Sequence, residues 1–361
     1  MNPSALIPTP DTIPAPAWLF AVLGVVLFTL HILVINALLG TGLITLFFRV
    51  VKKTTETPNY LAENVAVKTA ALFAFGINLG VAALLFLQVL YGHFMYTSSV
   101  LTAVYWILVI PLLIVAYYAG YGYIRQRAKS PTFSTVSLGI STAILLYIAF
   151  AFVNNMTLLQ IPEQWGAYFE NRGGTLTALS DPIFWPRLFH FVVASIAVGG
   201  LFLSIAAYFR ARKTGADAHA HIGRGLRIFV VATTVQVLVG LWFFLVLPGN
   251  IQQAFLGANL LYTAVFGLGI LSALSMIVFA YRGQLKAVVI HLGAVVILMA
   301  VHRFNLRALY LEEHFSLGDL KVSPQYGVLA LFLLVLILGA AAVVYMVRLV
   351  RRSAKEEETA S

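Results

Sequence analysis

The stretch Ala17–Phe48 reads AWLFAVLGVVLFTLHILVINALLGTGLITLFF and contains no charged residue. A helix needs about 20 apolar residues to cross the ~30 Å hydrocarbon core of a bilayer, so this stretch can span a membrane. Eight further stretches share its apolar character: 66–92, 100–124, 134–155, 184–210, 227–247, 258–281, 287–305 and 326–348. They are too long and too uniformly apolar for the alternating strands of a membrane barrel. The sequence therefore predicts an all-α integral membrane bundle of nine transmembrane helices.

The composition of the whole chain agrees with this prediction. Of its 361 residues, 61% are hydrophobic and 10% are charged, whereas roughly a quarter of the residues in a soluble domain are charged. A soluble protein is therefore excluded. The chain has no cysteine, which excludes disulfides, thiolate metal sites, iron–sulfur clusters and thioether-linked heme.

The basic residues predict how the bundle is oriented. If the N-terminus lies outside, the cytoplasmic segments hold 18 of the 23 lysines and arginines, and the outer segments hold 5. This bias follows the positive-inside rule. We predict an outer N-terminal segment (1–16), a nine-helix transmembrane domain (17–348) and a cytoplasmic tail (349–361). Two outer segments, Met156–Ile183 and Asn305–Gln325, are long enough to fold over the surface.

The net charge of +10 then reports orientation. The basic residues of the cytoplasmic segments would face anionic lipid head groups. Membrane lipid is therefore the expected partner, and nucleic acid is not. We expect a multi-pass protein of the cytoplasmic membrane of a bacterium or archaeon.

Acidic residues are missing from all nine stretches, although the chain has thirteen of them. Proton-coupled transporters and pumps carry carboxylates inside the membrane as proton relays. Pro111 is the only proline deep within a predicted span, so the paired broken helices of a transporter site are not indicated.

Histidines, in contrast, occur in or beside the spans. The candidate metal ligands are His31, His93, His190, His291 and His302. His291 and His302 are 11 residues apart, which is almost three helical turns, so both point from one helix face about 16 Å apart. Neutral imidazoles in a bundle without carboxylates or cysteines suit axial ligation of heme iron. The alternative for any single histidine is a hydrogen-bonding or interfacial residue.

Three arginines near the outer ends of these helices complete the pattern: Arg187, Arg303 and Arg307. Heme propionates are anionic and pair well with guanidinium groups, so these residues are the candidate cofactor-binding residues. The alternative is that they snorkel from helix ends to the membrane surface.

Four segments together resemble subunit I of the cytochrome bd quinol oxidases over residues 1–210, and more loosely over 227–348. They are Leu30–Ile32 with Asn36–Gly40, Phe75–Asn78 with Gly80–Ala82, Gln88 and Tyr91-Gly92, Asn154–Met156, and Arg187–His190 with Ala194-Ser195. The resemblance implies that His31 ligates a high-spin heme and that His190 ligates the low-spin heme b. His302 lies near the family's glutamate ligand of a second high-spin heme. Two or three b hemes are implied, and a quinone is a further candidate ligand.

The chain departs from the family pattern where the oxidase chemistry would lie. Leu101–Tyr123 lacks the family's glutamates, and His302–Asn305 replaces its Gly-Arg-Gln-Pro-Trp motif. Val265 stands where the family has a methionine heme ligand, and Pro248–Gly257 is all that remains of the long quinol-binding loop.

We therefore favour a multi-heme b electron-transfer subunit over a self-contained oxidase. It would relay electrons between the quinone pool and a periplasmic cytochrome or other redox protein on the outer face, beside other subunits of a respiratory complex. We expect His190 with His302 or His93 to hold an outer heme, and His31 with His291 a deeper one. Two alternatives stay open: an active bd-type quinol:oxygen oxidoreductase, and a transporter or anchor whose histidines only pack.

Overall fold

The computed structural model describes residues 3–54, 56–64, 68–215 and 217–360. In these residues the chain forms helices and one isolated β-bridge between Ile13 and Val322, with no strand. Nine of the described helices are long and apolar enough to cross a membrane, which confirms the predicted all-α membrane bundle. Which end faces outside stays a prediction, and positions 66–67 of the predicted second span lie outside the described residues.

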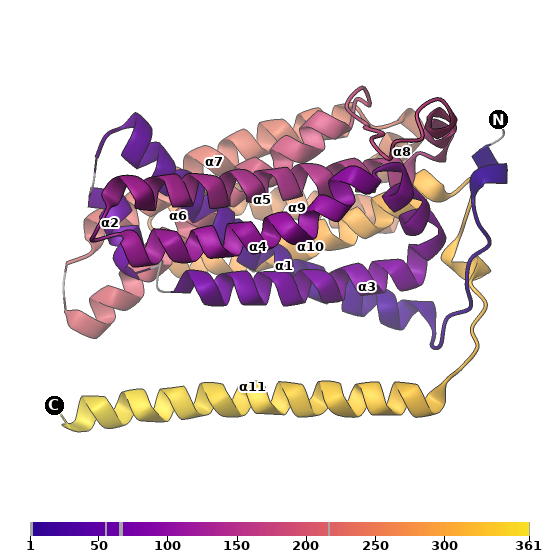
Figure 1. Ribbon diagram of the computed structural model, residues 1–361. Helices are drawn as coiled ribbons and strands as arrows, with labels where there is room; N and C mark the ends of the chain where they lie inside the picture. Colours follow the sequence, from indigo (N-terminus) through magenta and orange to yellow (C-terminus); the bar gives the residue numbers. More distant parts are fainter. Residues whose placement is uncertain (1–2, 55, 65–67, 216, 361) are drawn as a thin grey trace.

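The membrane-spanning helices follow one another along the chain, with connections that range from Thr102 alone, between α3 and α4, to residues 161–183, between α5 and α6 (Figure 1). They are α1 (Ala17–Leu46), α3 (Thr69–Leu101), α4 (Ala103–Gln126), α5 (Pro131–Gln160), α6 (Phe184–Thr214), α7 (His219–Leu245), α9 (Leu260–Tyr281), α10 (Leu285–Leu311) and α11 (Tyr326–Ala360). The shorter elements are η1 (Pro3–Leu6), η2 (Phe47–Val51), α2 (Glu56–Asn64), η4 (Pro162–Phe169), α8 (Gly249–Gln253), η5 (Ala254–Ala258) and η6 (Leu317–Asp319).

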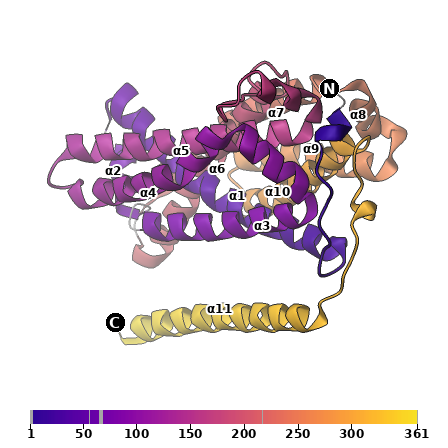
Figure 2. The ribbon, with the colours of Figure 1, turned by 45° about the vertical axis from the view of Figure 1, so that its right-hand side comes forward.

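Eight of the long helices pack side by side, and α11 stands apart from them in both ribbon views (Figures 1 and 2). The chain that leads into α11 is tied to the bundle, because the Ile13 amide donates to the Lys321 carbonyl at 2.9 Å. A ring contact of 6.5 Å between Phe86 and Phe332 joins α3 to α11.

Helix α1 packs against both α3 and α6, and the α1–α6 crossing is close. A Cβ atom on Gly40 would overlap the Ser195 carbonyl, and one on Gly199 would collide with the backbone of Gly40. Glycine at both positions therefore allows the two backbones to touch, as small residues do in membrane bundles.

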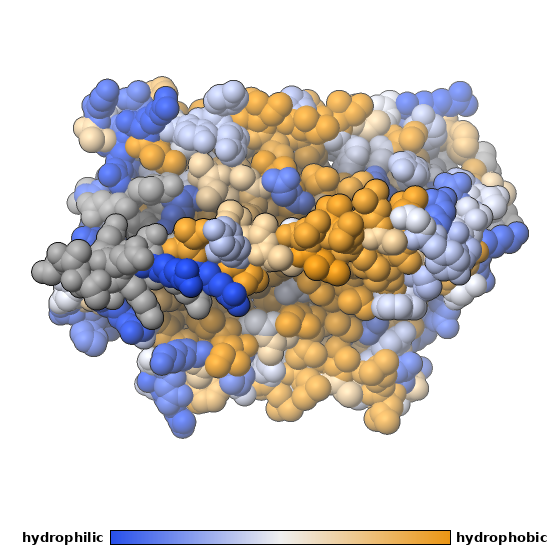
Figure 3. All heavy atoms as spheres, turned by 90° about the horizontal axis from the view of Figure 1, so that it is seen from below, coloured by the Kyte–Doolittle hydropathy of each residue, from blue (hydrophilic) through white to orange (hydrophobic). Residues whose placement is uncertain are grey.

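The bundle has two distinct ends. The loop end carries η1, η4 and α8. The basic end carries α2, whose Glu56 is ion-paired with Arg224, and η2, which contains Arg49. Figure 3 shows apolar side chains across the middle of the molecule and hydrophilic ones toward both ends. This distribution is the one expected for a protein that crosses a bilayer.

Several helices at the loop end run further than the hydropathy pattern predicts. Helix α5 continues to Gln160 and α10 to Leu311, so the predicted outer segments 156–183 and 305–325 begin too early. Helix α3 runs on to Leu101 through a kink at Tyr91 (φ −132°, ψ 31°). In the last turns of α3 and α5, polar residues find hydrogen-bond partners on other helices, as Ser98 does with Asn155 and Gln160 does with Arg187. A hydropathy window cannot register such partners. As a result, Arg307 lies within a bundle helix and not in a loop.

The C-terminal boundary also differs. Helix α11 continues through the predicted tail to Ala360, where alanine, lysine and glutamate have high helix propensity.

Candidate functional site

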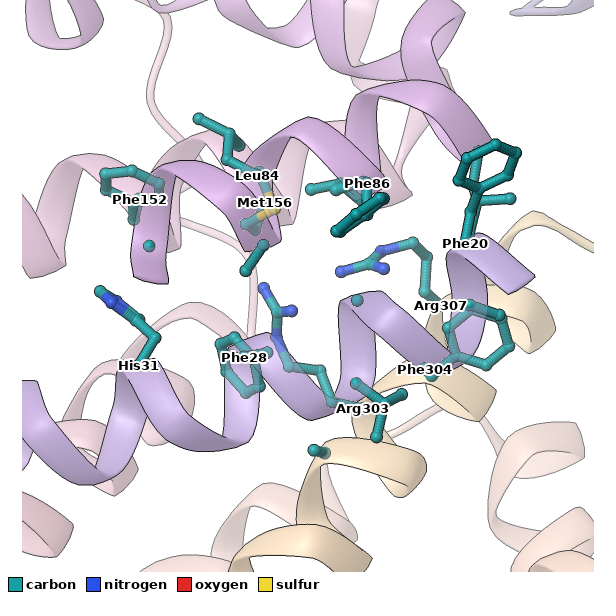
Figure 4. Close-up of a pocket in the computed structure, with 18 residues that line it drawn as sticks. Phe20, Phe28, His31, Leu84, Phe86, Phe152, Met156, Arg303, Phe304 and Arg307 are labelled. Atoms are coloured by element: carbon teal, nitrogen blue, oxygen red, sulfur yellow. The ribbon is translucent and has the colours of Figure 1, made fainter. Parts of the chain in front are cut away.

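A cavity lies between α1, α3, α5 and α10 in the half of the bundle next to the loop end (Figure 4). Its volume is about 100 Å³, and the space between its walls, including the open mouth, is about 720 Å³. The walls are aromatic and aliphatic. The charged or titratable side chains that line it are His31, Arg303 and Arg307, all three predicted as site residues.

His31 is held in a defined orientation by α3. Its Nδ1 lies 2.8 Å from the Gly76 carbonyl oxygen, and because a carbonyl only accepts, Nδ1 carries the proton of the neutral ring. A Cβ atom on Gly80 would lie 2.6 Å from the His31 Cε1, so only glycine leaves room for the ring. The Nε2 atom keeps its lone pair and makes no hydrogen bond with any residue in the described ranges. A metal-ligating histidine has this arrangement, with one nitrogen oriented by a carbonyl and the other available.

Arg303 and Arg307 follow one another by a single turn of α10. The guanidinium carbon of Arg303 lies 4.4 Å from the centroid of the Phe28 ring, and that of Arg307 lies 5.2 Å from the Tyr91 ring. Arg307 is buried, with 6% of its surface exposed. Neither guanidinium forms a hydrogen bond or ion pair within the described part of the chain. Two cations in an apolar cavity without an anion are costly, so the cavity is suited to an anionic ligand.

Arg187, the third predicted arginine, is placed differently. Its Nη1 donates to the Thr157 hydroxyl at 2.9 Å, and its Nη2 donates to the Gln160 side-chain oxygen at 2.6 Å. Both partners lie in the last turn of α5, so Arg187 ties α6 to α5. It does not line the cavity.

His190 and His302 lie outside the cavity, on α6 and α10. The Nδ1 atom of each is buried and has no hydrogen-bond partner among the described residues. The His302 ring contacts Phe255 at 4.1 Å and stacks on Phe266 at 5.4 Å between centroids. Both members of the first predicted outer pairing are thus buried next to aromatic rings with an unpartnered Nδ1; the pairing itself stays a prediction.

The remaining predicted histidines are engaged elsewhere. His93 is buried at the loop end against Phe315, with ring centroids 4.6 Å apart. The Nδ1 of His291 bonds the Ala287 carbonyl of its own helix at 2.8 Å. No contact within the described residues joins His291 to His31. The described residues also hold no group of three or more histidine and acidic side chains that could bind a free metal ion.

Two features of the cavity were missed from the sequence. The first is the role of Gly76 and Gly80, whose i, i+4 spacing places both on one face of α3. The second is Met156, whose side chain lines the cavity from α5. The sequence feature that could have pointed to Met156 is its position directly after two consecutive asparagines in an apolar span.

No protein-family model matches the chain, and no curated protein matches it. The fold and the cavity define a multi-pass helical membrane protein with a histidine and two unpaired arginines around one apolar space. The likeness to cytochrome bd subunit I rests on the sequence motifs alone.

Proposed function

We propose that this chain is a heme b-binding electron-transfer subunit of a membrane redox complex. The observation that carries the proposal is the combination, in one apolar cavity, of the available His31 Nε2 with the two unpaired guanidinium groups of Arg303 and Arg307.

The donors in the cavity suit heme b. Its iron accepts neutral imidazole nitrogen, and its two propionates are anions that arginine binds well. The macrocycle of heme is flat and apolar. The cavity walls are also apolar, and five phenylalanines contribute to them: Phe20, Phe28, Phe86, Phe152 and Phe304.

Each residue then has a physical role. His31 would ligate iron through Nε2, while the Gly76 carbonyl fixes its tautomer and ring direction. Arg303 and Arg307 would bind the propionates, which would neutralise the two cations. Bound heme supplies a one-electron carrier, and the apolar walls exclude water from it.

A second heme would use the pair His190 and His302, whose buried Nδ1 atoms lack partners in the described chain. Two hemes would let electrons pass between the quinone pool and a redox protein docked at the loop end. The distribution of lysine and arginine favours the loop end as the outer face. A quinone site and the other subunits of the complex belong to this proposal.

Electron transfer is favoured over oxygen reduction because no Asp or Glu lies within the nine apolar stretches. Reduction of oxygen consumes protons, and proton routes in membranes are built mainly from ionisable side chains.

The proposal is tested by a pyridine hemochrome assay and a reduced-minus-oxidised spectrum of the protein purified from membranes. We expect heme b in the wild type and one heme fewer in His31→Ala. The matched control is His219→Ala, because His219 is exposed at the basic end of α7 and its loss is expected to leave the spectrum unchanged.

Two results would count against the proposal. A wild-type protein without heme b would reject it. An unchanged heme content in both His31→Ala and His190→Ala would show that these histidines only pack, as expected for a transporter or anchor. Oxygen consumption with quinol by the purified complex would favour the oxidase alternative.

A further inference from the structure

The walls of the cavity offer few atoms that could ligate iron. Among the residues that line it, only the His31 imidazole and the Met156 thioether have a nitrogen or sulfur lone pair suited to heme iron. The guanidinium groups of Arg303 and Arg307 stay protonated and cannot ligate. Figure 4 shows His31 and Met156 at the same cavity, on helices α1 and α5.

Met156 lies in a part of α5 that is fixed from both sides. Asn154 on one side accepts from the Ala178 amide at 2.7 Å and donates to the Leu176 carbonyl at 3.0 Å. Asn155 bonds three hydroxyl groups at the junction of α3 and α4, those of Ser98, Ser99 and Thr102. The next residue, Thr157, accepts the bond from Arg187.

These neighbours make α5 rigid at the point where Met156 meets the cavity. Asn154, Asn155 and Thr157 are all fully buried, and Met156 itself is 7% exposed. A buried asparagine costs free energy unless it is hydrogen-bonded, so two in sequence indicate that the position of this turn matters. A methionine that only fills space adapts its rotamers and needs no such support.

We infer that the Met156 thioether and the His31 imidazole would together ligate the iron of a heme held in this cavity. The inference rests on the proposed function and names a ligand that the sequence did not indicate. It also replaces His291, which bonds its own helix, as the expected partner of His31.

A histidine–methionine pair has consequences of its own. Both axial positions would be filled, so this heme would be low-spin and closed to external ligands. Methionine ligation also raises the reduction potential relative to two histidines. The cavity heme would therefore be the stronger electron acceptor of the two, and a carrier with no site for oxygen.

The first test uses the ferric wild-type protein. Near-infrared magnetic circular dichroism distinguishes a thioether–iron bond from ligation by two nitrogens, and we expect the thioether signal for one heme per chain. A protein that contains heme b but lacks this signal overturns the inference and leaves the proposed function standing. A protein without heme b overturns both.

The second test is Met156→Leu, which keeps an apolar side chain of similar volume. We expect an unchanged heme content, loss of one low-spin signal in electron paramagnetic resonance, and one new site for carbon monoxide in the ferrous protein. Met156→His should restore the low-spin form without the thioether signal. An unchanged spin state in Met156→Leu overturns the inference.

The matched control is Met276→Leu. Met276 is also buried, with 5% of its surface exposed, but lies on α9 away from the cavity. This substitution should leave the spin state and carbon monoxide binding as in the wild type. If Met156→Leu fails to fold, the wild-type spectrum still decides.

Discussion

Arginines at the two ends of the bundle have different surroundings. At the basic end, Arg224 forms an ion pair of 3.0 Å with Glu56 and donates to the Thr57 hydroxyl at 2.6 Å. Near the loop end, Arg303 and Arg307 have only aromatic rings as close partners within the described residues. The first arginine is partly exposed and paired, whereas the other two face an apolar cavity without an anion.

Under the proposed function, the difference separates an arginine that completes the fold from two arginines that bind a ligand. A charge taken out of water costs several kcal/mol unless an opposite charge or hydrogen bonds compensate it. The chain provides that compensation for Arg224 and provides none for Arg303 and Arg307. An anion bound in the cavity would provide this compensation for Arg303 and Arg307, as the proposed function requires.

The largest effect is expected from removing both cavity cations. Arg303→Leu combined with Arg307→Leu should abolish the cavity heme, because each charged hydrogen bond contributes about 1.5–3 kcal/mol, or roughly 10- to 100-fold in affinity. The same variant should raise the thermal stability of the heme-free protein, since it removes unpaired charge. Heme content and the melting temperature of protein made under heme limitation measure the two effects.

The control for this pair of effects is Arg224→Leu, which should keep both hemes and lose stability. If the double variant retained its heme, or if its heme-free form were less stable than the wild type, the result would contradict the interpretation that Arg303 and Arg307 bind a ligand while Arg224 stabilises the fold.

A smaller effect is expected at Gly80. In Gly80→Ala the new Cβ would lie 2.6 Å from the His31 Cε1 and 2.7 Å from its Nδ1, so the ring must move away from its bond to Gly76. Such overpacking costs about 1–3 kcal/mol, and we expect heme to be lost about ten times faster to an excess of a heme-scavenging protein. Gly139→Ala on α5 is the control, because its Cβ would meet open space. Equal rates in the two variants would remove Gly80 from the site.

Arg187 provides a further test of the difference between paired and unpaired arginines. Because it bonds Thr157 and Gln160, we expect Arg187→Leu to lower the free energy of unfolding by about 1–3 kcal/mol and to leave the cavity heme in place. Thermal unfolding and the heme spectrum measure this. Loss of the cavity heme with normal stability would instead place Arg187 among the propionate ligands.

The sequence predicts much of the fold because membrane spans depend on local composition. All nine described spans match the predicted apolar stretches, since each needs only about 20 apolar residues in a row. The predicted ends of α5 and α10 were too early. At the end of α5 the reason is that Thr157 and Gln160 accept hydrogen bonds from a residue of α6, which local composition does not reveal. Arg187 and Gln160, for instance, are 27 positions apart.

Contacts between residues far apart in the sequence also decide which candidate residues form the site. His31, Arg303 and Arg307 could be selected as candidates from residue type and position alone. That Arg187 is paired while Arg303 is not depends on packing between helices, and so does the contact of His31 with Gly76, 45 positions away. Met156 was missed because methionine in an apolar span usually fills space.

The smallest expected effect concerns the paired end. Hydrogen bonding and the positive charge of Arg224 lower the pKa of Glu56 below its ordinary value of 4.5. A carboxyl group with a lowered pKa stabilises the folded state above its ordinary pKa, and this contribution is lost as the pH falls through the lowered value. Acidification from about pH 5 to about pH 3 should therefore release α2 from α7, while the cavity at the other end has no carboxyl group to titrate.

Spin labels can measure this release, because a chain without cysteine can be labelled at two introduced sites. In Asn59→Cys with Arg227→Cys, both positions are exposed, one on α2 and one on α7. We expect a narrow distance distribution at neutral pH that broadens on acidification, and a broad one at every pH when Glu56→Gln is added. Glu312→Gln at the loop end is the control and should follow the wild type. A distribution that stays narrow at low pH would show that Arg224 holds α2 without the carboxylate charge, and the contrast between paired and unpaired arginines would then rest on hydrogen bonds more than on charge.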